Sequence, residues 1–283
     1  GSRQALLGGS ASHFAMSARL FTKVHLVSVI GQDFPIKYLK MLKSKGVDLT
    51  SVIEREGKNF QWNGEYKKGD YNTALTLSTE LGVLANYSPQ VACEHRNIPN
   101  VFLANFDPNV QMKFLKLMRN SELVGLDSMN LWINNMRPSV IKLMKKVNLF
   151  VLNDGEAAQL SGETNLIKAA KRLRKMGPEF IVIKKGEHGV LFYCDKFMFS
   201  FSAHPVEQVV DPTGAGDTFA GGLMGYLSKA GKINEGVLRK AVLYATTLAS
   251  FNVEGFATSQ TSSLTLPKVN TRLKSLVKFI SPQ

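Results

Sequence analysis

The chain has 283 residues, of which 44% are hydrophobic and 20% charged, a composition that excludes a disordered or fibrous protein. Lysine and arginine outnumber aspartate and glutamate by 35 to 22, so the formal net charge is +13. No stretch approaches the ~18 consecutive apolar residues that a membrane helix requires, and we expect no membrane partner.

The basic residues raise the question of an anionic partner. The densest basic cluster lies within 168–175, but no aromatic residues alternate with it, as a surface that stacks bases would require. A solvated helix face explains the cluster better, and we expect no nucleic-acid partner. Cys93 and Cys194 stand in unrelated contexts, which indicates free thiols and favours a cytoplasmic location.

Most of the chain alternates short apolar runs with helical patterns, which is typical of a mostly parallel sheet flanked by helices. The predicted strands are 24–30, 100–104, 123–126, 148–152 and 180–183. The predicted helices are 35–45, 108–119, 133–146 and 164–176, followed by long helices over about 215–229, 234–251 and 268–280. The fold class is therefore α/β.

One segment, residues 52–79, interrupts this alternation. Phe60, Trp62 and Tyr66 would share one face of a strand, 67–70 has turn chemistry, and 71–78 is a Thr-rich second strand. We expect a β-hairpin that acts as a lid over a site or as a homodimer interface, because large aromatic side chains on two strands need a covering surface. A purely decorative hairpin is the remaining alternative.

The most informative stretch is 210–222, where turn residues lead directly into a long apolar helix. Gly214, Ala215 and Gly216 would present backbone N–H groups at the helix N-terminus, which attracts anions. Asp217, in the first turn, could accept a proton from a hydroxyl. Read in isolation, a short Gly-x-Gly-Asp sequence is more often a simple turn followed by an acidic residue that favours the helix dipole.

The complete string Asp-Pro-Thr-Gly-Ala-Gly-Asp-Thr-Phe-Ala-Gly-Gly, 211–222, closely resembles the C-terminal signature of the ribokinase-like (PfkB) carbohydrate kinases. Four other segments match in the family's order: Gly-Gly-Ser-Ala at 8–11, Val-Ile-Gly-Gln-Asp-Phe at 29–34, Asn-Asp-Gly-Glu at 153–156 and Lys-Lys-Gly-Glu-His-Gly at 184–189. The resemblance spans nearly the whole chain. No P-loop sequence competes with it.

The resemblance implies transfer of the ATP γ-phosphoryl group to an alcohol. Asp217 would be the base, and the backbone of Gly214, Ala215 and Gly216 would stabilise the transferring group. Glu156 would hold Mg²⁺ through water, although Asn153 and Glu156 also suit a plain helix cap. The other implied nucleotide residues are Asn153, Lys184, Gly186, Glu187, Thr213 and Gly255, and the implied substrate residues are Gly8, Gly9, Asp33 and Asn105. Asp127 and Asn130 are weaker candidates, and Lys184 and Lys185 suit solvent equally well.

The sequence departs from the family at its start. The family normally opens with a strand that carries an Asp for the substrate's hydroxyls, so we interpret 1–283 as a single kinase domain without that strand. We expect a sugar-like substrate, and a nucleoside (adenosine-type) kinase or a catalytically silent ligand-binding protein are the alternatives. The expected cofactors are ATP and Mg²⁺, and a monovalent-cation site around 245–255 is left open.

Overall fold

A six-stranded sheet forms the centre of the computed structural model, which describes residues 6–66 and 74–281. Its strand order is β10-β9-β8-β7-β6-β5. The strands are β5 (Asn100–Leu103), β6 (Leu123–Asp127), β7 (Leu149–Asn153), β8 (Phe180–Lys184), β9 (Val190–Tyr193) and β10 (Met198–Phe201). β5 to β8 run parallel, and β9 and β10 continue the sheet antiparallel. The predicted fold class is confirmed, although the sequence pattern did not predict β9 and β10.

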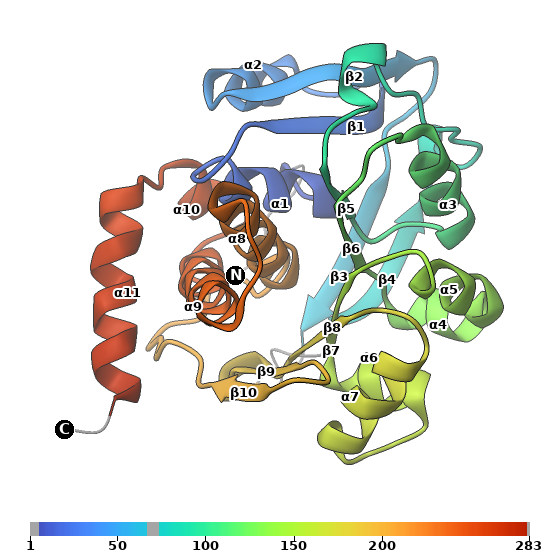
Figure 1. Ribbon diagram of the computed structural model, residues 1–283. Helices are drawn as coiled ribbons and strands as arrows, with labels where there is room; N and C mark the ends of the chain where they lie inside the picture. Colours follow the sequence, from blue (N-terminus) through green and yellow to red (C-terminus); the bar gives the residue numbers. More distant parts are fainter. Residues whose placement is uncertain (1–5, 67–73, 282–283) are drawn as a thin grey trace.

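Helices cover both faces of this sheet (Figure 1). One face packs against α3 (Pro108–Leu117), α4 (Asn130–Asn135), α5 (Arg137–Met144), α6 (Asp154–Ser161) and α7 (Leu166–Lys175). The other packs against α8 (Ala215–Ala230) and α9 (Glu235–Asn252). α1 (Ser10–Ala18) lies on α8, and α10 (Ser259–Ser262) and α11 (Leu266–Ile280) lie beside α9. The parallel strands, buried on both faces, are accordingly almost entirely apolar.

The helix predicted over 133–146 is wrong in one respect, because this segment forms the separate helices α4 and α5. Met136 lies between them with a non-helical backbone, φ −136° and ψ 30°. Pro138 follows in the first turn of α5. Proline has no N–H and clashes with the carbonyl one turn earlier, so a continuous helix would be strained here.

A second, smaller sheet pairs β1 (Val24–Gly31) with β2 (Val47–Arg55) in parallel, and α2 (Ile36–Ser44) connects them. The strand β2 was not predicted. Among the described residues, neither strand pairs with the six-stranded sheet, so the two sheets are separate. A cavity of about 3550 Å³ is lined by both of these strands and extends to the carboxyl ends of the main sheet.

The predicted hairpin is present as a third sheet, in which β3 (Gln61–Tyr66) pairs antiparallel with β4 (Ala74–Glu80). The predicted turn at 67–70 and the start of the second strand lie outside the described residues. Trp62 is fixed on this sheet by a hydrogen bond from its Nε1 to Thr76 Oγ1 (3.1 Å). Trp62 and Tyr66 both line the large cavity, so the aromatic face is turned toward it.

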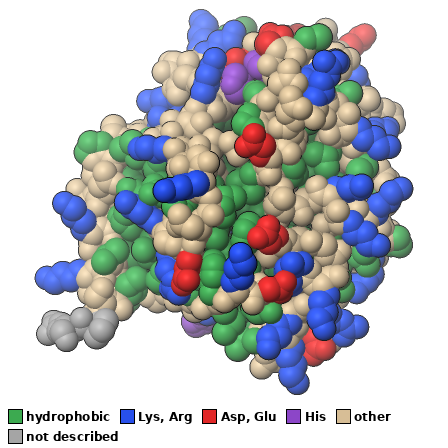
Figure 2. Space-filling model, in the orientation of Figure 1, with side chains coloured by type: hydrophobic (Ala, Val, Ile, Leu, Met, Phe, Trp, Pro, Cys, Tyr) green, Lys and Arg blue, Asp and Glu red, His purple; other side chains and the backbone are tan. Residues whose placement is uncertain are grey.

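The surface agrees with the interpretation of the basic residues. Lysine and arginine side chains are scattered over the face shown in Figure 2 rather than gathered in one stripe. The cluster at 168–175 occupies the outer side of α7, whose inner side is buried through Ala169, Ala170 and Leu173. In the part of the chain that the structure describes, no helix combines the length and the apolar character needed to cross a membrane.

Candidate active site

A cluster of hydrogen-bonded, buried side chains holds the turn that precedes α8. Gly214 is the N-cap of α8 in a left-handed conformation, φ 77°. The Nδ2 of Asn252 donates to the Thr213 carbonyl (2.8 Å), and its Oδ1 accepts from Thr218 Oγ1 (3.0 Å) and His13 Nδ1 (2.9 Å). A Cβ on Gly214 would lie 2.3 Å from the His13 ring, so the turn closes only over glycine.

The amides of this turn are not equivalent. The N–H of Ala215 donates to the Pro212 carbonyl (3.1 Å), and that of Thr218 to the Gly214 carbonyl (2.8 Å). The N–H groups of Gly216 and Asp217 have no acceptor among the described residues. Of the predicted anion-binding amides, that of Ala215 is therefore already engaged. The N–H of Gly214 also has no acceptor among the described residues, so the open donors at the start of α8 belong to Gly214, Gly216 and Asp217.

The carboxylate of Asp217 belongs to the same first turn of α8 as these open amides. Burial raises its pKa, while Lys184 and a hydrogen bond from the Ser10 hydroxyl lower it. Ser10 directly follows Gly9, the left-handed N-cap of α1 (φ 87°). The glycine pair near the start of the chain is thereby joined to the α8 turn.

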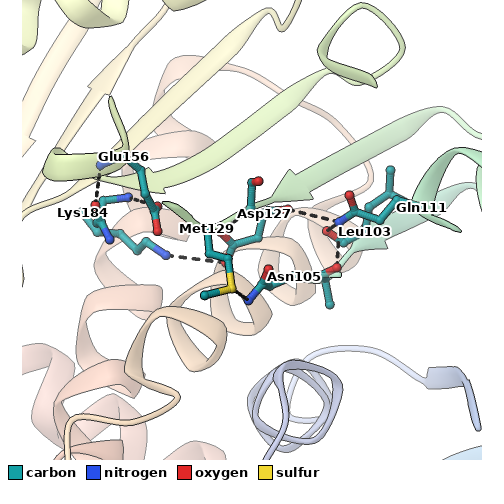
Figure 3. Close-up of polar contacts among 10 residues, drawn as sticks. Leu103, Asn105, Gln111, Asp127, Met129, Glu156 and Lys184 are labelled. Atoms are coloured by element: carbon teal, nitrogen blue, oxygen red, sulfur yellow. Dashed lines mark hydrogen bonds and ion pairs between the residues drawn. The ribbon is translucent and has the colours of Figure 1, made fainter. Parts of the chain in front are cut away.

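Lys184 is the central cation of the site. It ends β8, and its Nζ lies 3.6 Å from an oxygen of Asp127, the last residue of β6 (Figure 3). Both side chains are largely buried, with 18% and 6% exposed. A Cβ on Gly216 would lie 2.7 Å from the same Nζ, so the ammonium group is packed against the α8 turn. The solvent-facing alternative for Lys184 is wrong.

The groups around Lys184 are electrostatically coupled. Burial raises the pKa of Asp127 to about 6 and that of Glu156 to about 7, and in both cases Lys184 opposes the rise. Burial alone would lower the pKa of Lys184, but the carboxylates of Asp127, Glu156 and Asp217 outweigh it, so the pKa is raised. Three carboxylates around one ammonium group leave an excess of negative charge, which favours binding of a cation.

Asn153 and Glu156 form a reciprocal cap at the start of α6. The Asn153 Oδ1 accepts from the Glu156 amide (2.7 Å), and the Glu156 Oε2 accepts from the Asn153 amide (2.8 Å). The helix-cap interpretation is thus satisfied, and the Oε1 of Glu156 is not used in it. That oxygen and the Asp127 carboxylate are hard oxygen ligands of the kind that Mg²⁺ binds directly or through water.

The ends of β5 and β6 are tied together beside this cluster. The Nε2 of Gln111, from α3, donates to the carbonyls of Leu103 (3.3 Å), Ala104 (2.8 Å) and Asp127 (3.2 Å), as Figure 3 shows. This buried amide fixes the strand end that carries Asp127. Sequence reasoning gave Gln111 no role, because its acceptors are main-chain groups that only the packed sheet brings together.

The predicted substrate residues all line the large cavity. A Cβ on Gly8 or Gly9 would have no neighbour within 4 Å, so the space beside them is open. Asp33 accepts from the backbone amide of Asn59 (2.8 Å) and therefore also ties the loop after β1 to the hairpin. Asn105 accepts from the Trp132 Nε1 (3.0 Å) and donates to the Met129 sulfur (3.2 Å), so both ends of its amide are engaged.

The predicted nucleotide residues are more dispersed. Thr213 lines the cavity, and its hydroxyl lies 3.4 Å from the Tyr66 hydroxyl of the hairpin. Gly186 and Glu187 lie in the exposed turn between β8 and β9, and Gly255 is buried in the turn after α9. Among the described residues, these three do not line the large cavity. The structure therefore places Gly186 and Glu187 just after the end of β8, and Gly255 just after α9, all outside this cavity.

Comparisons with known proteins define the class. The family model described as pfkB family carbohydrate kinase matches residues 3–265. A cytidine kinase of Thermococcus kodakarensis is 31% identical over 242 residues, which cover 83% of this chain and 85% of that protein. A nucleoside kinase of Methanothermobacter thermautotrophicus is 26% identical and covers 88% of this chain and 79% of its own length.

Among solved structures, the nucleoside kinase of Methanocaldococcus jannaschii has a TM-score of 0.73 at 23% identity, covering 95% of this chain and 86% of that one. At this identity the likeness concerns the fold. The molecule has the fold of a ribokinase-like kinase. This chain belongs to the pfkB family of carbohydrate kinases, and it is an ATP-dependent kinase of a sugar or nucleoside.

Proposed function

We propose that this chain is a nucleoside kinase that transfers the γ-phosphoryl group of ATP to a hydroxyl of the nucleoside's ribose. Three features that lie together at the start of α8 support the phosphoryl-transfer chemistry. These are the Asp217 carboxylate, the open amides of Gly216 and Asp217, and the Lys184 ammonium packed against the same turn.

In this proposal Asp217 accepts the proton of the attacking hydroxyl. The substrate oxygen then forms a bond to the γ-phosphorus, and the bond from that phosphorus to the ADP oxygen breaks, so ADP leaves with the electron pair. Charge spreads over the transferring phosphoryl oxygens during this step. The α8 amides and Lys184 face that charge without rearrangement, which is how a preorganised site lowers a barrier.

Glu156, with Asp127 beside it, would hold the Mg²⁺ that accompanies ATP. Their oxygens and the excess negative charge fit the ion, which supplies charge neutralisation to the phosphates when bound. We further propose that Gly186, Glu187 and Gly255 border the nucleotide. A monovalent cation near Gly255 stays a prediction, to be tested by the K⁺ dependence of ATP turnover.

Two observations favour a nucleoside over a free sugar. The aromatic side chains of Trp62 and Tyr66 line the same cavity as Asp217, where a base could stack. The two relatives described above, which this chain matches over most of its length, bear the names cytidine kinase and nucleoside kinase. Hydrogen bonding between Tyr66 and Thr213 brings the hairpin directly to the α8 turn, so a base held by the lid would leave its ribose near Asp217.

Coupled ADP release with cytidine, adenosine, inosine, ribose and fructose tests the substrate. We expect kcat/KM to be highest for a nucleoside, and Trp62→Ala to raise the nucleoside KM while leaving the ATP KM within about twofold. Leu75→Ala, on the neighbouring strand, is the matched control, because Leu75 is exposed and is not among the residues that line the cavity. Preference for a free sugar, with no effect of Trp62→Ala, would contradict the nucleoside assignment but leave the kinase chemistry intact.

The dimer and the cytoplasmic location also stay predictions. Leu75 and Leu77 of β4 are 51% and 55% exposed, an apolar surface that a second copy could cover. Sedimentation of the wild type and of Leu75→Ser/Leu77→Ser tests this dimer. Both cysteines are free, as a reducing compartment requires.

A further inference from the structure

A cluster of two histidines and one aspartate lies away from the α8 turn, at the end of the β1–β2 sheet where both strands begin. His25 is on β1, and Asp48 is the second residue of β2. His95 ends the short 3₁₀-helix η2 (Cys93–His95) that precedes β5. The kinase chemistry uses none of them. Among the described residues, they are the one group of three or more His, Cys, Asp or Glu side chains whose candidate ligand atoms all lie within 4.8 Å of one another.

The three facing atoms form a compact triangle. The Nδ1 of His25 lies 3.0 Å from the Nε2 of His95 and 3.1 Å from the Oδ2 of Asp48, and the third side, from His95 Nε2 to Asp48 Oδ2, is 3.5 Å. Ligand atoms bound about 2.0–2.1 Å from a tetrahedral ion lie about 3.3 Å apart. The observed separations bracket that value.

Hydrogen bonding alone accounts poorly for this triangle. A proton on His25 Nδ1 can point at His95 or at Asp48, but the His95 Nε2 lone pair and the Asp48 oxygen still face one another. Adding a second proton on His95 Nε2 would place two N–H groups against each other at 3.0 Å. A cation at the centre satisfies all three atoms at once.

The surroundings also hold the ligand atoms in the required orientation. The far nitrogen of His95, Nδ1, lies 3.3 Å from the Ser51 hydroxyl, which itself accepts from the Ala92 amide (3.1 Å). The other Asp48 oxygen accepts from the Thr50 amide (2.9 Å), so Oδ2 stays available. Partners of this kind fix the tautomer and orientation of metal ligands. His25 and His95 line the large cavity, which gives an ion a route in.

We propose that His25, Asp48 and His95 form a binding site for a divalent transition metal of the Zn²⁺ class. Two imidazoles and one carboxylate select such ions over Mg²⁺ and Ca²⁺, which prefer oxygen ligands alone. The fourth position is left to water. The ion would join the β1–β2 sheet to the segment that leads into β5, across the region where no described strand connects the two sheets.

The test measures Zn²⁺ and Co²⁺ binding to nucleotide-free, tag-free protein. Millimolar Mg²⁺ is present to occupy the proposed Mg²⁺ ligands Asp127 and Glu156. We expect one Zn²⁺ per chain by equilibrium dialysis, a Co²⁺ absorption spectrum of low coordination number, and a rise in Tm with Zn²⁺ that Mg²⁺ does not produce. His95→Gln and Asp48→Asn should each weaken Zn²⁺ binding by more than about 100-fold, and Ser51→Ala by roughly 10–100-fold.

Two controls isolate the cluster. Cys93→Ser removes the exposed thiol two residues from His95, and His204→Gln removes a histidine outside the cluster, so both should leave Zn²⁺ affinity unchanged. His25→Gln serves as a further ligand variant if His95→Gln fails to fold, because His25 is less buried than His95. Equal Zn²⁺ affinity in the wild type and in folded ligand variants would overturn the proposal.

Discussion

The Nζ of Lys184 lies against Gly216, so close that a Cβ on this glycine would be only 2.7 Å from it. This relationship joins the end of a central strand to the N-terminus of α8. It places a positive charge from a side chain beside the open amides of the helix. The absence of a side chain at Gly216 is therefore what allows the ammonium group and the helix N-terminus to lie side by side, where we propose that both face the transferred phosphoryl group.

Gly216→Ala should lower kcat by roughly 10–100-fold, because the methyl group displaces the ammonium from its place beside the turn. Since only the flexible end of Lys184 must move, the free energy of unfolding should change little. Steady-state ADP release and chemical denaturation check the two parts. A large loss of stability with normal kcat would show that this close contact serves folding alone.

Asp217→Asn should lower kcat by about 10²–10⁴-fold, the usual contribution of a general base. The substitution keeps the size and hydrogen-bonding reach of the side chain and removes only the proton acceptor. ATP affinity, measured by titration with a non-hydrolysable analogue, should barely change. Retention of more than roughly a tenth of wild-type kcat would mean that another group takes the proton.

Turnover should rise with pH through about 6 to 7, where Asp127 and Glu156 lose their protons and become able to hold Mg²⁺. Stability should move in the opposite direction. The pKa values of both groups are raised in the folded protein, from 3.8 and 4.5. The stability they contribute is therefore complete below about pH 4 and is lost as pH rises through 6 to 7.

Glu156→Gln tests whether the ionised carboxylate of Glu156 both supports turnover and lowers the stability of the folded protein. Glutamine can still accept from the Asn153 amide and keeps the helix cap, but it carries no charge. We expect a Tm a few degrees above wild type at pH 8 without Mg²⁺, little difference near pH 5, and a kcat reduced at every pH. Differential scanning calorimetry across this pH range decides it, and a uniformly lower Tm for the variant would count against the assigned pKa shift.

Gly214→Ala and Gly231→Ala form a matched pair at the two ends of α8. Both glycines are left-handed, with φ of 77° and 66°, but a Cβ on Gly214 would strike the His13 ring whereas one on Gly231 would meet nothing within 4 Å. Gly231→Ala should cost only about 1 kcal/mol with normal kcat. Gly214→Ala should cost several times more and abolish turnover. Similar losses in denaturation and activity assays for both would remove the role assigned to His13 and Asn252.

Local sequence determined much of this protein. The strands, the long helices and the glycine-rich turn at 211–217 follow from apolar spacing and from glycines at a helix start, which are properties of neighbouring residues. The hairpin with its aromatic face was likewise evident from alternation. The strand β2 was missed, because the apolar–polar alternation that begins at Val47–Thr50 is interrupted by Ser51 and Val52, which exchange the expected apolar and polar positions.

The tertiary structure decided which of the predicted residues act together. From the sequence, Lys184 suited solvent as well as a site, and Asp127 was only a weaker candidate for substrate binding. Only the sheet, by aligning the ends of β6 and β8, buries them side by side and couples them to Glu156.

The triangle of His25, Asp48 and His95 has the same origin, since its members are far apart in the sequence. Local propensity fixes backbone elements through contacts a few residues apart. Charge coupling and ligand convergence depend instead on distances of a few ångströms between remote segments, which exist only after the chain has packed.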